Sequence, residues 1–82
     1  MNLITTEAQL RSHIPNIIAA VKGETPLLKK LSLFLDLAED WVINTFTSTS
    51  TFNTICGYTD SNNIKILCSR LVVAEAMLRA IP

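Results

Sequence analysis

The sequence is poor in charge, in aromatic rings and in the residues that build catalytic or metal sites. Of its 82 residues 17% are charged and 6% aromatic, and it has one histidine, two cysteines and two glycines. A typical globular domain has roughly 25% charged residues. The seven basic and seven acidic residues cancel, so no basic surface for nucleic acid is expected. Disorder is excluded as well, because it requires low hydrophobicity and 49% of the residues are apolar.

Long hydrophobic runs are also missing. A membrane span needs roughly 18 or more apolar residues, and Arg70, Glu75 and Arg79 interrupt the most apolar segment. The N-terminal MNLITTEAQLR lacks the basic start and apolar run of a secretion signal. Without such a signal, Cys56 and Cys68 are expected to be reduced thiols in the cytoplasm and not a disulfide.

No residue pattern indicates a catalytic or metal site, and neither an enzyme nor a cofactor is expected. A metal site needs three or four converging ligands, whereas His13 is the only histidine and the cysteines stand apart in sequence. Paired carboxylates can perform acid–base chemistry, and three acidic side chains cluster at Asp36, Glu39 and Asp40. They are predicted to lie on the helix face opposite the core, either solvated or paired with charges of a neighbouring subunit.

The N-terminal region predicts one or two short helices. Thr6 and Gln9 have the spacing of a capping box, so Thr6 is expected to cap a short helix. Pro15 should end it, because proline disfavours helical geometry at the residue before it. A second short helix is expected over residues 17–22, with Gly23 after its end.

The clearest element is a long helix at about 26–46, capped by Thr25 with Pro26 in the first helical position. One apolar arc is expected to face the core; it contains Leu27, Leu28, Leu31, Phe34, Leu35, Ala38, Trp41, Val42 and Phe46. Leu33, Leu37 and Ile43 form a second, narrower apolar strip within the polar face. The Thr/Ser-rich segment that follows, 47–60, is predicted to be a loop, with a short hairpin around 52–58 as the alternative.

A last helix is predicted at about 61–81, capped by Asp60 or Ser61. Two apolar stripes run along it: Ile64, Leu67, Leu71, Ala74 and Leu78 form the main stripe, and Ile66, Val73, Met77 and Ala80 form another on the far side. Only one other long helix is available, so one side should lack an internal partner. Glu75 and Arg79 have the i,i+4 spacing of a helical ion pair.

The predicted fold is all-α: a small bundle of two long helices with one or two short N-terminal helices, forming one domain over 1–82 or the N-terminal part of a longer protein. The excess apolar surface predicts self-association. The candidate interface residues, taken from the sides expected to face away from the core, are Leu33, Leu37, Ile43, Arg70, Val73 and Met77.

Three segments also carry a family resemblance: the capped helix ITTEAQLRSHI, the long helix LSLFLDLAEDW, and the Leu/Ala-rich LCSRLVVAEAMLRA. Their order resembles the head–tail connector proteins of tailed phages and prophages, and more narrowly uncharacterised prophage-type proteins of gut bacteria that begin LITTE. The pattern departs from the connectors after the last helix, where those proteins continue into a C-terminal arm.

The resemblance implies an all-α, non-enzymatic subunit of a ring between portal and tail, located in the cytoplasm of a bacterial host or in the virion. Its partners would be further copies of itself and portal or tail proteins. The main alternative is a small helical module that binds another protein's helix. Two weaker alternatives are an enzyme whose remaining residues follow Pro82 and a helix-turn-helix DNA-binding protein, in which Leu27, Leu28 and Leu31 would occupy the base-reading positions.

Overall fold

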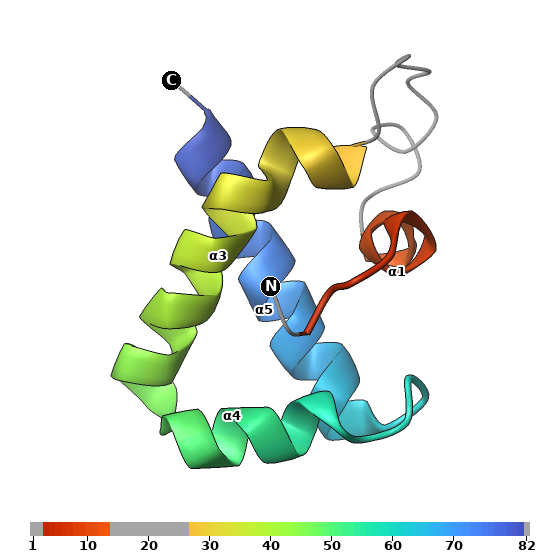
Figure 1. The fold of residues 1–82 in the computed structure, drawn as a ribbon, viewed down its shortest axis with the longest axis vertical. Helices are drawn as coiled ribbons and strands as arrows, with labels where there is room; N and C mark the ends of the chain where they lie inside the picture. Colours follow the sequence, from red (N-terminus) through yellow and green to blue (C-terminus); the bar gives the residue numbers. More distant parts are fainter. Residues whose placement is uncertain (1–2, 14–26, 82) are drawn as a thin grey trace.

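The computed structural model describes residues 3–13 and 27–81, and the regular structure within these ranges is entirely α-helical. The elements in order are α1 (Glu7–Ser12), α3 (Leu27–Phe46), α4 (Thr49–Cys56) and α5 (Asn63–Ala80). The long helices α3 and α5 pack against each other, α4 connects them at one end, and α1 lies at the side (Figure 1). The predicted all-α fold with two long helices is thereby confirmed. The short helix predicted at 17–22 lies outside the described residues.

Helix α1 begins with the predicted capping box. The Thr6 hydroxyl accepts a hydrogen bond of 3.1 Å from the backbone N–H of Gln9, and the Gln9 side chain accepts one of 3.2 Å from the backbone N–H of Thr6. Leu10 is fully buried, together with Leu3 and Ile4 before the helix. The cap therefore fixes a very short helix whose stability comes mainly from three apolar side chains packed into the core.

A glutamate on α1 ties this short helix to the start of α3. Glu7 accepts a 2.7 Å hydrogen bond from the backbone N–H of Leu28 and pairs with Arg11 at 3.0 Å. The first N–H groups of a helix have no partner within the helix, and a carboxylate is favoured there by the helix dipole. Glu7 thus positions α1 at the N-terminal end of α3.

The core lies between α3 and α5 and is closed at its sides by the N-terminal segment and α4. Its fully buried apolar residues are Leu3, Ile4, Leu10, Leu35, Ala38, Val42, Phe52, Val72, Val73 and Ala76. The α3 members belong to the predicted apolar arc. Phe46, also in that arc, is instead exposed and makes an edge contact with Trp41, with ring centroids 5.3 Å apart.

Residues 49–56 of the Thr/Ser-rich segment form helix α4, so the prediction of a loop over 47–60 was wrong for these residues; residues 57–60 form the connection that follows. Ser48 caps α4 by accepting a 3.2 Å hydrogen bond from the backbone N–H of Thr51, and Phe52 anchors the helix in the core. The helix-propensity deficit of threonine is only a few tenths of a kcal/mol per residue. A cap contributes about 1 kcal/mol and a buried phenylalanine about 2 kcal/mol or more, which together outweigh the deficit.

Helix α5 begins slightly later than predicted. Its N-cap is Asn62, whose side-chain oxygen accepts hydrogen bonds from the backbone N–H groups of Ile64 and Lys65 at 2.9 and 3.2 Å. Neither of the two predicted caps, Asp60 and Ser61, occupies this position: both lie in the connection from α4, where Asp60 pairs with Lys65.

Candidate functional site

The most prominent surface feature is a row of apolar side chains along the outer side of α5. Among them the large residues are exposed by between 38% (Leu71) and 66% (Leu78). The row, called the α5 seam below, consists of Ile64, Leu67, Leu71, Ala74, Leu78 and Ile81. The successive spacings are 3, 4, 3, 4 and 3 residues. That alternation is the spacing of the a and d positions of a coiled coil, which meet a facing helix.

The opposite side of α5 faces the core with smaller and more mixed residues: Lys65, Ser69, Val72, Val73 and Ala76. Val72 and Ala76 are small or β-branched, and Ala38 on α3 is also fully buried. Small side chains let two helix axes approach closely, so this side fits against α3 better than a row of leucines would.

The main stripe predicted for the last helix therefore lies outside, which reverses the expected orientation of α5. One apolar side does lack a partner within the chain, but it is the leucine-rich stripe. The far-side stripe of Ile66, Val73, Met77 and Ala80 turns toward the protein: Val73 is buried in the core, and the other three are partly buried.

Three of the six candidate interface residues are exposed, namely Leu33, Leu37 and Arg70. Of the other three, Val73 is buried in the core and does not fit the predicted interface, whereas Ile43 and Met77 are partly buried and pack against the core. The periodicity of a helix places apolar strips at defined angles but does not select the strip that faces inward.

Charged side chains flank the α5 seam. Glu75 pairs with Arg79 at 3.1 Å, which confirms the predicted i,i+4 contact. Arg70 is exposed on the other edge of the seam, and no ion pair of Arg70 occurs within residues 3–13 and 27–81. The seam thus has an apolar centre and one charge of each sign at its borders.

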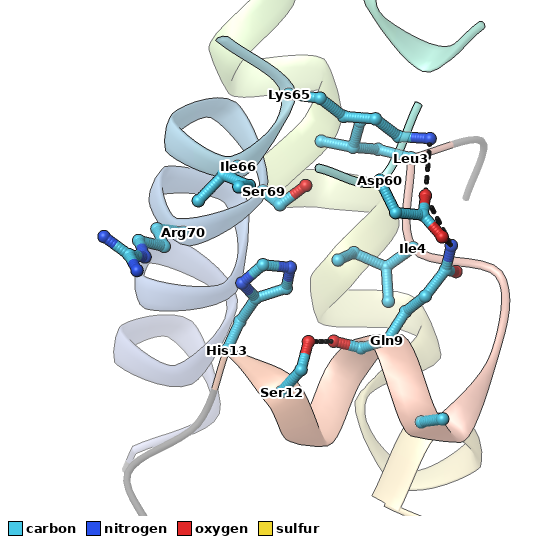
Figure 2. A pocket seen from close by; sticks show the side chains of 11 residues that line it. Leu3, Ile4, Gln9, Ser12, His13, Asp60, Lys65, Ile66, Ser69 and Arg70 are labelled. Atoms are coloured by element: carbon cyan, nitrogen blue, oxygen red, sulfur yellow. Dashed lines mark hydrogen bonds and ion pairs between the residues drawn. The ribbon is translucent and has the colours of Figure 1, made fainter. Parts of the chain in front are cut away.

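A hollow of about 440 Å³, lined by both polar and apolar side chains, lies between α1, the α4–α5 connection and the first half of α5 (Figure 2). It is lined by Leu3, Ile4, Ala8, Gln9, Ser12, His13, Asp60, Lys65, Ile66, Ser69 and Arg70. Lys65 donates to Asp60 and to the backbone carbonyl of Tyr58, both at 3.0 Å. Gln9 donates to the same carboxylate at 3.3 Å, so these hydrogen bonds join α1 to the base of α5.

His13 lies between the end of α1 and α5 at the edge of this hollow (Figure 2). Burial and the nearby Arg70 cation lower the pKa of His13 below its ordinary 6.5, and Asp60 acts in the opposite direction. Nucleophilic catalysis would need a hydrogen bond from this imidazole to a serine or thiol. The described part of the chain has no such bond, and no group of three His, Cys, Asp or Glu residues there could hold a metal ion.

Glu39 was expected on the solvated face of the long helix but is only 5% exposed, whereas Asp36 and Asp40 are exposed as predicted. Cys56 and Cys68 are free, partly buried thiols. Burial raises the pKa of both thiols, and the negative charge of Glu39 acts in the same direction. The pair is thus poorly suited to nucleophilic chemistry.

One sign of the α5 seam was readable in the sequence: the alternating spacing continues to Ile81, which a core stripe does not require. The burial of Glu39 and Lys65 had no sign in the sequence.

None of the helices in the described ranges is long and apolar enough to span a membrane. Comparison with protein-family models, curated proteins and solved structures finds no match to this chain.

Proposed function

We propose that this chain is a non-enzymatic assembly protein that associates with further copies of itself through its exposed apolar surface. The observation that carries the proposal is the α5 seam. Monomeric proteins rarely expose a continuous apolar row of this length, and such rows are typical of protein–protein contacts.

The energetics of the seam support association. Two copies would contribute ten large side chains, each gaining about 1 kcal/mol or more on burial. The sum is on the order of 10 kcal/mol, which is comparable to the 4–15 kcal/mol that association costs in lost freedom of motion. Burial of the whole seam is therefore of the size needed to offset the cost of association, and the remaining difference sets the affinity.

A second exposed patch on α3 extends the proposal from a pair to a larger assembly. Leu33 and Leu37 are 63% and 42% exposed and lie one turn apart on that helix. An assembly of more than two copies needs a second contact on each subunit. This patch and the α5 seam lie on different helices, so copies that pair along the seam can be joined further through the patch. A ring subunit of the phage or prophage head–tail connector type, with portal and tail proteins as partners, fits this arrangement.

The test is the mass of the purified protein in solution, measured by size-exclusion chromatography with light scattering. The wild-type chain should be oligomeric in the micromolar range, and Leu71→Glu should shift it toward the monomer. Leu33→Glu should reduce the size of larger assemblies. Asn44→Glu, at an exposed polar position of α3, is the matched control and should have no effect. A wild-type chain that stays monomeric at about 100 µM would contradict self-assembly.

The alternative is a helical interaction or regulatory module that binds another protein. The observation that favours it is the hollow between α1 and α5, because binding sites for partners are usually concave. The genomic setting separates the two: neighbouring portal, capsid and tail genes would support the assembly protein, and their absence together with a monomeric chain would support the module.

A further inference from the structure

We infer that two copies of this chain pair along the α5 seam in parallel and in register, with Arg70 of each copy against Glu75 of the other. This inference rests on the proposed self-assembly and specifies its geometry. Two features of the described structure carry it. The exposed apolar residues have coiled-coil spacing, and the two borders of the seam bear opposite charges, Arg70 on one and Glu75 on the other.

The apolar spacing defines the contact. With Ile64, Leu71 and Leu78 as a positions, the d positions are Leu67, Ala74 and Ile81, and all six are exposed. Within α5, from Ile64 to Leu78, the seam is roughly 21 Å long at 1.5 Å per residue, and Ile81 is the C-cap residue directly after the helix. A second helix with the same spacing is the partner whose side chains fit between these residues layer by layer, and another copy of α5 has that spacing.

The charges then select the orientation. Arg70 precedes an a position and Glu75 follows a d position, which makes them the g and e residues of successive heptads. In a parallel pair, the g residue of one helix faces the e residue five positions further along the other. Arg70 therefore meets Glu75 of the second copy, and the two-fold symmetry makes this contact twice.

An antiparallel pair lacks this complementarity. There the g residues of the two helices lie on the same side, so Arg70 would be nearest to Met77 and Arg70 of the second copy and would not meet Glu75. The intrahelical pair of Glu75 with Arg79 does not prevent the parallel contact, because a carboxylate has two oxygens and accepts several hydrogen bonds.

The first experiment exchanges the charges. Arg70→Glu alone and Glu75→Arg alone each place like charges at both contacts, and each should weaken the dimer about tenfold, equal to about 1.4 kcal/mol. An equimolar mixture of the two variants restores both opposite-charge contacts in the heterodimer. The mixture should therefore associate about as tightly as the wild type in analytical ultracentrifugation, with circular dichroism used to verify that each variant is folded.

The second experiment measures the orientation directly in a Cys56→Ser, Cys68→Ala background. Ile64→Cys should form a disulfide-linked dimer on mild oxidation, because like positions face each other in a parallel register. In an antiparallel pair the two copies of position 64 would be about 25 Å apart. The linked dimer would then form in a mixture of the Ile64→Cys chain with an Ile81→Cys chain, and not with the Ile64→Cys chain alone.

The outcomes separate this inference from the proposed function. Self-assembly would stand if the wild-type chain associates and Leu71→Glu disrupts the association. The parallel pair would still be overturned if the charge mixture does not restore association and the disulfide joins position 64 to position 81. Association only with a different protein, or a strictly monomeric chain, would overturn both.

Discussion

The ammonium of Lys65 lies 3.0 Å from the carboxylate of Asp60, although Lys65 is only 9% exposed and Asp60 is a surface residue. The same ammonium donates to the backbone carbonyl of Tyr58 at 3.0 Å. The apolar stem of the lysine is therefore buried on the inner side of α5 while its charged end reaches the connection from α4. This one side chain joins the first turn of α5 to the segment that precedes it.

Replacement of this lysine should separate the contribution of its stem from that of its charge. Lys65→Ala removes both and should lower the free energy of unfolding by about 1–3 kcal/mol. Lys65→Met keeps an apolar chain of similar length and should lower it less. Urea denaturation measures both values. Lys29→Ala, at an exposed position of α3, is the control, and equal losses for Ala and Met would contradict a structural role for the stem.

The pKa of His13 should respond in opposite directions to its two charged neighbours. Burial and Arg70 lower this pKa, and Asp60 raises it. Arg70→Gln should therefore raise the pKa toward its ordinary value, and Asp60→Asn should lower it further. Because His13 is the only histidine, a titration of its imidazole signals by NMR gives the value without overlap. No change in either variant would contradict the placement of His13 beside the hollow.

The lowered pKa of His13 makes the free energy of unfolding depend on pH. The pKa of His13 is lower in the folded chain than the value of about 6.5 in the unfolded chain, so the unfolded state binds more protons. The contribution of neutral His13 to the free energy of unfolding should be complete above about pH 6.5. It should decline as the pH falls through the pKa of His13 in the folded chain.

The free energy of unfolding of the wild type and of His13→Gln is measured from pH 8 to 5. The difference between the two values cancels the titration of the groups that both chains share. Asp60, whose pKa is lowered by its hydrogen bonds with Lys65 and Gln9, loses its own contribution only at lower pH, below about 3.9. A difference that stays constant over the range would show that His13 titrates normally.

Phe52 should be essential for the position of α4. It is 1% exposed, and Phe52→Ala should cost about 3–5 kcal/mol. Domains of this length have roughly 3–5 kcal/mol of net stability, so the variant should be largely unfolded at 25 °C by circular dichroism. Phe52→Leu fills most of the space and should remain folded. Asn53→Ala, at an exposed position of the same helix, is the control and should retain wild-type helicity.

The two thiols should react slowly with iodoacetamide at pH 7.5 compared with the same chain in guanidinium chloride. Burial and the Glu39 charge both raise the pKa of Cys56 and of Cys68, and only the thiolate reacts. Glu39→Gln removes the neighbouring negative charge and should accelerate alkylation, measured by mass spectrometry of the two peptides. Asp36→Asn, at an exposed position of α3, should leave the rates unchanged; equal acceleration by both variants would contradict a specific effect of Glu39.

The sequence by itself determined the features that depend on neighbours within about four residues. The capping box of Thr6 and Gln9, the bounds of α3 and the pair of Glu75 and Arg79 all follow from local spacing, because a helix brings residues three and four apart together whatever surrounds it. The presence of two apolar sides on α5 was readable for the same reason.

The tertiary structure decided which of those sides is inside. Periodicity fixes the angle between two stripes, but only packing against α3 shows that the side with Val72 and Ala76 fits and the leucine side does not. The helical state of α4 was decided in the same way, because burial of Phe52 outweighs the low helix propensity of its threonines. The α5 seam is exposed because packing, and not hydrophobicity alone, selects the face that a helix buries.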